Sequence, residues 1–540
     1  MISAKALTPL AANNIPCEVR NTYDPSQPGT LVHGKAKRAD VVRGISHLHD
    51  VSSITLQGGG LRGRVGIARR VMDALASEAI SVLLIVQSSS EYSITLCVRK
   101  ADEKKARKAL KEEFHFERLH GLIEEISVQS DRAVVSLVGE GMKHYRGIAA
   151  RFLTAVSSAG VNVEVIAQGS TECAIALVVR GEDAQPATRA THTAFFSHST
   201  HIDLVLLGCG NVGGELLDQI QRQADNLIEH HVDLRVRAIA NSEKLLIADD
   251  KLDLASWQEE LSESGTAWSM DDVIAIRKNL GLLSPTIVDC TTDAELAGQY
   301  VTLLNNGFNI VAANKKANTA DYAYYREMRE AAARNFRTVL YETNVAAGLP
   351  FIDTLQGLIR SGDELKTFEG ILSGSLSMIF GLLEDGESMS RAVTRAMELG
   401  YTEPDPRDDL SGMDVARKLL IVAREVGLQL ELQDIDVEPV VPLDVVGHVD
   451  RSELIDALQT LDGAFADRVA AAAQEGKVLR YVARLEDGRC RVAIEAVPRS
   501  KPLGAIRDGE NALVIHTLYY QPIPMVLRGY GAGAAVTAAG

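Results

Sequence analysis

The sequence reads Ile202-Asp203-Leu204-Val205-Leu206-Leu207-Gly208-Cys209-Gly210-Asn211-Val212-Gly213 just before a long amphipathic stretch, 214–230. The apolar run predicts a buried strand and the amphipathic stretch predicts a helix, with three glycines spaced G-x-G-x-x-G between them. The first glycine permits a tight turn, the second lets a pyrophosphate approach the backbone, and the third lets the helix pack on the strand. Free N–H groups at the helix start then hold the phosphates. The stretch predicts a doubly wound, nucleotide-binding α/β sheet; a plain tight turn between strand and helix is the alternative.

Three more apolar runs, 234–240, 286–290 and 309–313, supply further strands of such a sheet. The first of them ends in Asn241-Ser242, without the acid that binds the ribose 2′-hydroxyl of NAD and repels the 2′-phosphate of NADP. With Lys244 close by, the sequence favours NADP and leaves NAD possible. Ligands bind beyond the carboxyl ends of these strands. The candidate cofactor contacts are therefore Gly208, Gly210, Asn211, Val212, Gly213, Asn241, Ser242, Thr291, Thr292 and Lys315.

A second unusual stretch runs from Gly400 to Lys418 and reads G-Y-T-E-P-D-P-R-D-D-L-S-G-M-D-V-A-R-K. Within twelve residues it holds five carboxylates, Glu403, Asp405, Asp408, Asp409 and Asp414. Its two prolines predict an extended first half, and the S-x-x-D pattern of Ser411 to Asp414 predicts a capping box before a helix. Asp414 and Lys418 would share one face of that helix. A rigid acidic cluster beside a lysine suits a cationic, polar small substrate; a surface ion pair behind a solvated loop is the alternative.

An internal duplication occupies about 44–180. Gln87-Ser88-Ser89-Ser90-Glu91-Tyr92-Ser93-Ile94 matches Gln168-Gly169-Ser170-Thr171-Glu172-Cys173-Ala174-Ile175, an offset of 81 residues, and the same offset relates several glycines. The first copy predicts a strand at 53–56, a helix at 66–77, strands at 80–86 and 93–98, and a helix at 100–116. The second predicts the same order at 133–138, 147–158, 161–167, 173–179 and 182–196. This is a β-α-β-β-α-β plan.

The duplicated plan, with its glycine turn before the first helix, resembles the ACT domain, a family of small ferredoxin-like modules that sense amino acids. By that resemblance the two copies pack side by side and bind an effector between them. Ile85, Gln87 and Gln168 are then candidate effector contacts. The alternative is that the two glutamines only cap turns.

Bulk composition excludes several classes of protein. At 540 residues the chain is long enough for several domains, and 46% hydrophobic with 24% charged residues is ordinary globular composition. A formal net charge of −16 without a long Lys/Arg run argues against nucleic acid and anionic membranes as partners. The six cysteines are far apart, with no C-x-x-C, which is typical of a reduced, cytoplasmic protein. No signal peptide or membrane-spanning run is evident; an organelle stroma is the expected location in a plant.

Three further motifs lie in the last part of the chain. They are Asn314-Lys315-Lys316, Leu340-Tyr341-Glu342-Thr343-Asn344-Val345-Ala346-Ala347-Gly348-Leu349-Pro350 and Ile371-Leu372-Ser373-Gly374-Ser375-Leu376-Ser377. Together with the glycine motif and the acidic stretch, they resemble the homoserine dehydrogenase family over about 203–540. With the tandem ACT unit in front, nearly all the chain resembles the bifunctional aspartokinase/homoserine dehydrogenases.

The resemblance implies roles for individual residues. Lys418 resembles the catalytic lysine that exchanges a proton with the reacting oxygen, and Lys315 the lysine that polarises that oxygen near the nicotinamide. Glu403, Asp409 and Asp414 resemble the substrate-holding carboxylates, and Gly533 a late glycine near the cofactor. A monovalent-cation site, for sodium or potassium, is implied at Glu342, Val345, Ala347 and Leu349. The implied effector is threonine, and the implied assembly is a homo-oligomer, a dimer or a tetramer.

The implied chemistry agrees with the residue types. Homoserine carries an ammonium, a carboxylate and a primary alcohol, so carboxylates can bind its ammonium. Oxidation to aspartate 4-semialdehyde sends a hydride to NADP and a proton to a base. A lysine can be that base if burial or a second cation lowers its pKa, and Lys315 beside Lys418 would be such a pair.

The expected domain order follows. Residues 1–43 resemble the end of an aspartate kinase region, 44–125 and 126–200 the two ACT domains, and 201–341 the Rossmann-type domain, with 528–540 returning to it. Residues 342–527 are the expected α+β catalytic and dimerisation domain. Kinase activity is not expected, and family members usually continue beyond the position of Gly540 into a further helix. Two alternatives stay open: a dehydrogenase of another small amino or hydroxy acid, and a catalytically silent regulatory fragment.

Overall fold

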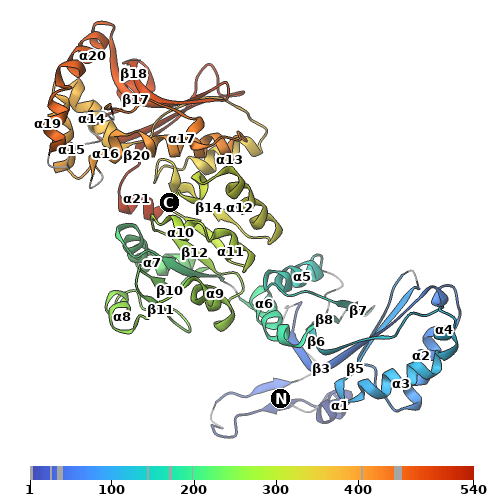
Figure 1. Cartoon of the computed structure of the whole chain (residues 1–540). Helices are drawn as coiled ribbons and strands as arrows, with labels where there is room; N and C mark the ends of the chain where they lie inside the picture. The colour runs from blue at the N-terminus through green and yellow to red at the C-terminus, as the bar shows by residue number, and fades with distance from the viewer. Residues whose placement is uncertain are drawn as a thin grey trace. The chain divides into compact units, whose positions relative to one another are not determined.

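The computed structural model describes residues 4–24, 27–32, 41–89, 91–140, 142, 145–169, 173–197, 199–402, 405–442, 445 and 453–540. The chain divides into two compact units, Met1–Phe196 and Ser197–Gly540 (Figure 1). Over the described ranges, none of the helices has both the length and the hydropathy that crossing a membrane requires.

The first unit is built on a six-stranded antiparallel sheet with strand order β4-β5-β3-β6-β8-β7. Its strands are β3 (Gly44–Gln57), β4 (Leu84–Gln87), β5 (Ser93–Arg99), β6 (Ser127–Val138), β7 (Val165–Gln168) and β8 (Ala174–Arg180). Its helices are α2 (Ile67–Ser77), α3 (Glu103–Glu113), α4 (His115–Leu119), α5 (Ile148–Ser158) and α6 (Ala184–Phe196). Each copy of the duplication has its own apolar core between sheet and helices. The predicted order of elements in both copies is therefore present.

The two copies share their longest strands. The second half of β3 pairs with β5 and with the start of β6, whereas Gly44–Leu48 pairs with Val134–Val138. The pairing register shifts near Asp50 and Asp131, which both adopt left-handed backbone conformations, with φ of 56° and 58°. Gly44–Leu48, which precedes the first predicted strand of the first copy, thus pairs with the sheet of the second copy. Sequence periodicity placed only the strand segments 53–56 and 133–138, because pairing between distant strands leaves no local signal.

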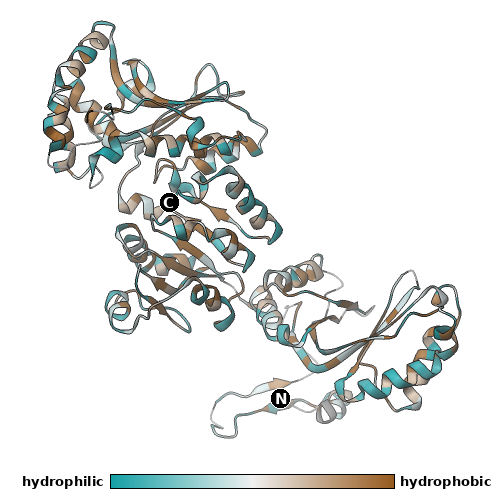
Figure 2. Ribbon diagram, viewed as in Figure 1, coloured by the Kyte–Doolittle hydropathy of each residue, from teal (hydrophilic) through white to brown (hydrophobic). Residues whose placement is uncertain are grey.

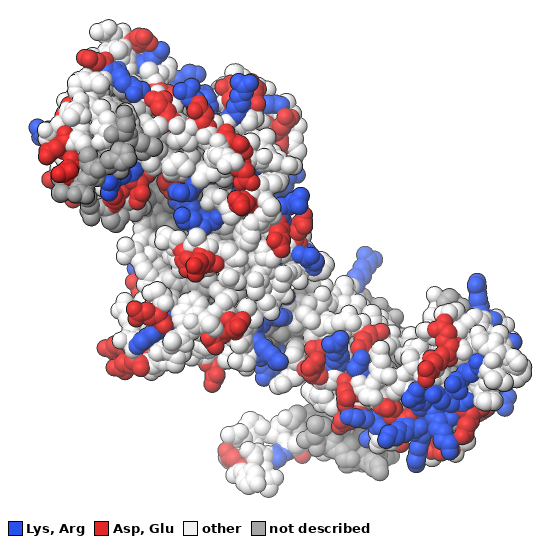
Figure 3. All heavy atoms as spheres, viewed as in Figure 1, with Lys and Arg blue, Asp and Glu red and all other residues white. Residues whose placement is uncertain are grey.

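A short segment precedes this sheet. It contains helix α1 (Ala4–Ala12) and an antiparallel pair of strands, β1 (Cys17–Val19) and β2 (Thr30–Val32). Figure 3 shows basic side chains gathered on the first unit over α3, among them Lys104, Arg107, Lys108 and Lys111.

The second unit begins with a six-stranded sheet of order β11-β10-β9-β12-β13-β14, parallel except for β11. The strands are β9 (Thr200–Leu207), β10 (Val232–Ala240), β11 (Leu245–Ile247), β12 (Thr286–Asp289), β13 (Asn309–Ala312) and β14 (Val339–Leu340). The helices are α7 (Asn211–Glu229), α8 (Trp257–Ser264), α9 (Met270–Asn279), α10 (Ala294–Ala297), α11 (Tyr300–Asn305) and α12 (Tyr322–Arg334). Figure 2 shows the inner strands as hydrophobic, as expected of a parallel sheet with covered faces. The predicted doubly wound sheet is confirmed.

A second six-stranded sheet follows, with order β16-β18-β17-β15-β19-β20, antiparallel except for β16. Its strands are β15 (Leu365–Ile371), β16 (Asp436–Val437), β17 (Lys477–Glu486), β18 (Arg489–Pro498), β19 (Glu510–Thr517) and β20 (Met525–Tyr530). Its helices are α13 (Ile352–Arg360), α14 (Gly374–Glu384), α15 (Met389–Glu398), α16 (Pro406–Leu410), α17 (Met413–Glu425), α19 (Leu454–Gln459), α20 (Asp462–Gln474) and α21 (Ala534–Ala539). One continuous apolar core, from Val205 to Ile515, spans both sheets of this unit. The predicted α/β and α+β classes are both present.

Candidate active site

The glycine motif forms the turn from β9 into α7, and each glycine meets a different constraint. Gly208 has φ of 96°, in the left-handed region that favours glycine. A Cβ on Gly213 would lie 1.9 Å from the Gly208 carbonyl oxygen, so only glycine fits there. A Cβ on Gly210 would meet nothing within 4 Å. The motif therefore packs tightly on its helix side and stays open at Gly210, where the start of α7 offers N–H groups to a phosphate.

A cavity of about 430 Å³ lies beside this turn, at the carboxyl ends of the strands. Its lining includes Gly208, Asn241, Ser242, Thr291 and Thr292, all predicted cofactor contacts, together with Trp268, Met270 and Gln299. The Asn241 Oδ1 accepts hydrogen bonds from the N–H groups of Glu243 (2.8 Å) and Lys244 (2.7 Å), which shapes the turn after β10. The Lys244 ammonium donates to the Ser262 carbonyl oxygen. Lys244 is therefore engaged by the protein itself.

A buried carboxylate organises the two loops between this cavity and Lys315. Asp289, at the end of β12, has no exposed surface. It accepts hydrogen bonds from the Tyr300 hydroxyl (2.7 Å), the Thr291 N–H (2.8 Å) and the Asn314 amide (3.1 Å). Burial raises the pKa of Asp289, and these hydrogen bonds oppose the rise. Asp289 was not among the predicted site residues; the only sequence signal is an acid ending a wholly apolar strand.

Lys315 and Lys418 meet at one carboxylate. The Lys315 Nζ lies 2.6 Å from Asp414 Oδ1, and the Lys418 Nζ lies 2.9 Å from Asp414 Oδ2. The Lys418 Nζ also donates to the Leu372 carbonyl oxygen at 2.7 Å, just beyond β15. The sequence predicted that Asp414 and Lys418 share a helix face and that Lys315 lies beside Lys418; in the structure Lys315, 99 positions before Asp414 in the chain, binds the same carboxylate.

The charges in this group shift the proton affinities of its members. Burial alone would raise the pKa of Asp414, but the charges of Lys418 and Lys315 outweigh it and hold this pKa well below its usual range. Burial and then the charge of Lys418 lower the pKa of Lys315, and Asp414 offsets only part of that effect. Lys315 is therefore a lysine that gives up a proton more readily than a lysine in water.

The start of α14 lies beside this group. The Ser373 hydroxyl caps α14 by accepting from the Leu376 N–H (3.2 Å), and it lies 2.8 Å from the Ser375 hydroxyl. The Ser375 hydroxyl in turn donates to Asp409 Oδ1 at 2.5 Å. Asp409 thus holds the turn that follows Leu372, the carbonyl partner of Lys418. No contact of these serines was predicted from the sequence.

Two sequence expectations for the acidic stretch are wrong. Pro406 does not extend the chain but begins α16, where its missing N–H costs nothing and Asp405 caps the helix through the Arg407 N–H. Ser411 does not cap α17; the cap is Gly412, with φ of 74°, where a Cβ would lie 1.9 Å from the Tyr481 hydroxyl. The left-handed backbone at Gly412 moves the start of the helix one residue further, and the Ser411 hydroxyl accepts from the Met413 N–H at 3.2 Å instead. Glu403 lies outside the described residues, so its predicted contact stays a prediction.

The implied cation loop has unusual backbone geometry. Glu342 accepts N–H hydrogen bonds from Ile352 (2.7 Å) and Asp353 (2.8 Å) at the start of α13. Burial raises its pKa. Ala346 and Ala347 both have positive φ, 56° and 42°, which is costly for alanine. Among the described residues, no hydrogen bond reaches the carbonyl oxygen of Val345 or Ala347. Two free carbonyls beside a carboxylate are donors that suit a monovalent cation.

The remaining predicted residues are placed as follows. Gly533, with φ of 118°, precedes α21, and α21 packs on α7 through a hydrogen bond from the Gln219 amide to the Ala535 carbonyl (2.8 Å). Gln87 and Gln168 are exposed and end the two edge strands of the first sheet. Ile85 is 38% exposed on β4. The structure places all three effector candidates at the edges of one sheet.

Family models match most of the chain. Residues 208–342 match the homoserine dehydrogenase NAD-binding domain, residues 350–540 match homoserine dehydrogenase, and residues 54–114 and 135–195 each match the ACT domain. These matches agree with the two units and with the internal duplication.

Several known proteins are similar to this chain. The bifunctional aspartokinase/homoserine dehydrogenase of Haemophilus influenzae is 47% identical over 541 residues, and that of Buchnera aphidicola is 39% identical over 542; both alignments cover all of this chain. The chain spans 66% of the length of each of these relatives. A crystal structure of a Candida auris protein of unknown function is 31% identical, with a TM-score of 0.59, over 63% of this chain and 96% of that one.

Proposed function

Because the chain belongs to the homoserine dehydrogenase family and carries two ACT segments ahead of its dehydrogenase part, we propose that it interconverts L-homoserine and L-aspartate 4-semialdehyde with a nicotinamide cofactor. The observation that supports this most is the Lys315–Asp414–Lys418 group, which joins the nucleotide-binding sheet to the second sheet. Lys315 of this group follows the carboxyl end of β13, and parallel sheets bind their ligands at the carboxyl ends of their strands. A group that can exchange protons would therefore lie beside the bound ligands.

The nucleotide site fits NADP. The open space beside Gly210 would admit the pyrophosphate, and the N–H groups at the start of α7 would bind it. Thr291 and Thr292 line the cavity beside this position. Asn241 and Ser242 directly follow β10, so no acid stands at the position where it would repel a 2′-phosphate. The preference for NADP rests on that position, since Lys244 is bound to Ser262. When bound, the nicotinamide supplies the hydride acceptor in one direction and the hydride donor in the other.

In this proposal the two lysines handle the proton of the substrate oxygen. Lys418 commits one N–H to Leu372 and another to Asp414, which leaves its third N–H for the substrate oxygen. During oxidation, Lys418 starts as the neutral amine, and its nitrogen lone pair takes the hydroxyl proton to give the ammonium; during reduction, the third N–H of the ammonium returns its proton to the oxygen. Lys315 polarises the same oxygen, and burial together with the nearby charge of Lys418 lowers the pKa of Lys315. Asp414, Asp409 and Glu403 are the carboxylates that we assign to the substrate.

Replacing Asp414 with asparagine is expected to move the alkaline limb of the pH profile for semialdehyde reduction to lower pH. Asp414 raises the pKa of Lys315, so its loss lets burial and Lys418 depress that pKa further. Reduction needs Lys315 in its ammonium form. The activity of the variant therefore falls at a lower pH than that of the parent, because Lys315 loses its proton at a lower pH. Initial rates from about pH 6 to 10 would show the shift. Asp408→Asn, on the exposed side of α16, is the control and should leave the limb in place. An unmoved limb in Asp414→Asn would contradict the coupling.

The loop after β14 is proposed to hold a monovalent cation, sodium or potassium. Its donors would be Glu342 and the carbonyl oxygens of Val345, Ala347 and Leu349. The free carbonyls of Val345 and Ala347 and the left-handed alanines beside them support this assignment. The cation would fix the loop that packs against Gly531, whose Cβ would lie 2.9 Å from the Ala346 carbonyl.

The first unit is proposed to bind threonine at its sheet edges and to lower dehydrogenase activity when it does so. Replacing Gln87 or Gln168 with alanine is expected to raise the half-inhibitory threonine concentration by about 10-fold or more, because each side chain would lose a hydrogen bond to a charged amino acid. Rates of NADP reduction at increasing threonine would measure the effect. Gln185→Ala, exposed on α6, is the control. An unchanged half-inhibitory threonine concentration in both variants would contradict the assignment of Gln87 and Gln168 as threonine contacts.

A homo-oligomer is also proposed. β20 is an edge strand with alternating exposed side chains, and Tyr530, Tyr519 and Ile523 near it are 61%, 68% and 80% exposed. Exposed apolar surface beside an open edge is typical of a subunit contact. None of the six cysteines, all of which lie in described parts of the chain, forms a disulfide, which fits the proposed cytoplasmic location.

The activity is tested by incubating the chain with L-aspartate 4-semialdehyde and NADPH. One homoserine should form for each NADPH oxidised, as measured by mass spectrometry and by absorbance. Absence of homoserine from a folded sample that binds NADPH would contradict the proposal and leave a silent regulatory protein.

A further inference from the structure

Arg424, near the end of α17, is a fully buried cation whose side chain has no exposed surface. All five of its N–H donors are used. The Nε and one terminal nitrogen donate to the Leu430 carbonyl (3.1 and 2.9 Å), and that nitrogen also donates to Glu431 (3.1 Å). The other donates to the carbonyls of Asn318 (2.9 Å) and Ala320 (2.7 Å). A guanidinium is the only side chain that can bind this many acceptors at once.

The acceptors Asn318 and Ala320 belong to the turn that carries Lys315. The Thr319 N–H donates to the Lys315 carbonyl at 3.1 Å, so residues 315–320 form one tight turn after β13. On its other side the Asn318 amide donates to Asn344 (2.8 Å), which donates to the Ala312 carbonyl at the end of β13 (2.8 Å). The turn is therefore fixed to its own sheet by Asn344 and to α17 by Arg424.

Helix α17 carries both of the other catalytic groups. Asp414 and Lys418 lie in its first turns and Arg424 in its last turn. The turn with Lys315 thus meets this helix at two points, through Lys315 to Asp414 at 2.6 Å and through Ala320 to Arg424 at 2.7 Å. Two attachments along one rigid helix fix both the distance and the direction of Lys315, whereas a single ion pair would leave it free to pivot.

We propose that Arg424 is a positioning residue, which sets the placement of Lys315 against Asp414 and Lys418 by holding the 315–320 turn on α17. The role rests on the activity proposed above. Arg424 touches neither substrate nor cofactor and acts through the main chain of the turn. The rings of Tyr322 and Tyr325, 5.6 and 5.1 Å from its guanidinium carbon, complete its surroundings.

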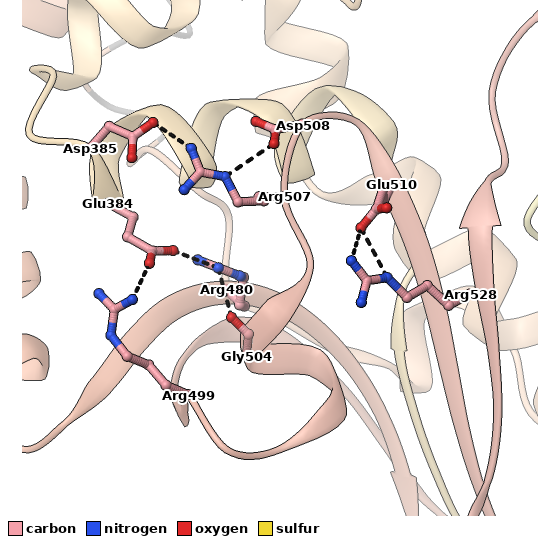
Figure 4. A network of polar contacts seen from close by, with 9 residues as sticks. All are labelled: Glu384, Asp385, Arg480, Arg499, Gly504, Arg507, Asp508, Glu510 and Arg528. Atoms are coloured by element: carbon pink, nitrogen blue, oxygen red, sulfur yellow. Dashed lines mark hydrogen bonds and ion pairs between the residues drawn. The ribbon is translucent and has the colours of Figure 1, made fainter.

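The chain contains a matched control, Arg480 on β17. Its side chain is 1% exposed, and it donates to Glu384 (2.6 Å) and to the carbonyls of Leu479 (2.8 Å) and Gly504 (2.9 Å). Figure 4 shows this network, in which Arg499 also reaches Glu384. All these partners lie in the second sheet and the elements packed on it. Arg480 is thus an equally buried arginine that joins nothing to the nucleotide-binding sheet.

The experiment compares Arg424→Lys with Arg480→Lys in the full chain. Lysine keeps the charge but offers three donors, so each variant loses stability. Arg424→Lys should lower kcat for homoserine oxidation about 10- to 100-fold, with the NADPH dissociation constant within about 2-fold of the parent, because a misplaced catalytic group slows chemistry rather than cofactor binding. Arg480→Lys should keep kcat within about 2-fold. Equal losses of kcat in the two variants would overturn the proposal.

A second readout does not depend on turnover. Lys315 is faced by Asp414, Lys418 and Arg417, and acetic anhydride labelling followed by peptide mass mapping reports the pH at which its amine becomes reactive. In Arg424→Lys this midpoint should rise toward that of an ordinary lysine, since Lys315 moves away from Lys418 and into water. It should stay unchanged in Arg480→Lys. An unmoved midpoint in Arg424→Lys would overturn the positioning role even if the parent had no homoserine activity.

Asn318→Ala is the second variant, in case Arg424→Lys does not fold. This substitution removes the hydrogen bond from Asn318 to Asn344, which holds the 315–320 turn on the side away from Arg424, and it leaves Arg424 in place. A lowered kcat and a raised labelling midpoint are expected again. If neither changes in Asn318→Ala, the idea that this turn positions Lys315 fails.

Discussion

Replacing Lys418 with alanine is expected to lower kcat for homoserine oxidation by about 10²- to 10⁴-fold, the usual contribution of a positioned acid–base group. Lys418 is held by the Leu372 carbonyl and Asp414 and is only 16% exposed, so no other side chain is held at this position to exchange the proton in its place. NADPH binding should be unchanged, because Lys418 lies on α17 and not on the nucleotide-binding sheet. Steady-state rates and a fluorescence titration with NADPH measure the two quantities separately.

Lys316→Ala is the matched control for this prediction. Lys316 neighbours Lys315 in the chain, and its N–H is bonded within the turn to Asn314 Oδ1 (3.1 Å). No ion pair joins its side chain to Asp414 among the described residues. Its replacement should leave kcat within about 2-fold. A Lys418→Ala enzyme as active as the parent would show that the proton is exchanged elsewhere, with Lys315 the next candidate because its pKa is lowered.

Gly213→Ala is expected to abolish cofactor binding and to lower the free energy of unfolding by about 3 kcal/mol or more. The added Cβ would lie 1.9 Å from the Gly208 carbonyl oxygen, a backbone atom that can move only if the turn from β9 into α7 moves with it. Overpacking in such a place is at the high end of the usual range of 1–3 kcal/mol. Thermal unfolding and NADPH titration measure the two effects.

Two neighbouring glycines supply controls with different outcomes. A Cβ on Gly214 lies 4.0 Å from its nearest neighbour inside α7, so Gly214→Ala should raise the free energy of unfolding by about 0.5–1 kcal/mol and leave binding intact. A Cβ on Gly210 meets no protein atom within 4 Å, so Gly210→Ala should fold normally. Its affinity for NADPH should fall, because the added methyl group would occupy the space into which the pyrophosphate approaches. Three equal effects at positions 210, 213 and 214 would contradict the assigned roles.

The sequence was informative where structure depends on local pattern. The glycine spacing placed the turn from β9 into α7, and the apolar runs placed β10, β12 and β13 within about two residues. The 81-residue offset predicted the order of elements in both ACT copies. Each of these features depends on side-chain periodicity or on a glycine at a fixed position, which a single stretch of sequence records.

Features that depend on distant contacts were not predictable. The pairing of Gly44–Leu48 with β6 and the hydrogen bonds of Asp289 join segments that share no local pattern. The cap of α17 was misassigned because the left-handed backbone at Gly412 moves the helix start by one residue; glycine is needed there because Tyr481, from a strand far along the chain, occupies the space of a side chain. In the active site, the pair Asp414 and Lys418 followed from helix spacing, whereas the carbonyl of Leu372 required the fold.

Deuterium transfer from L-homoserine labelled with two deuterium atoms at C4 tests the central claim most directly. The chain is incubated with this substrate and NADP, and the nucleotide is analysed by mass spectrometry. The account predicts NADPH that carries one deuterium and aspartate 4-semialdehyde that retains the other, with formation of both lost in Lys418→Ala. Unlabelled nucleotide, in a folded sample saturated with NADP, would contradict hydride transfer from the homoserine alcohol carbon.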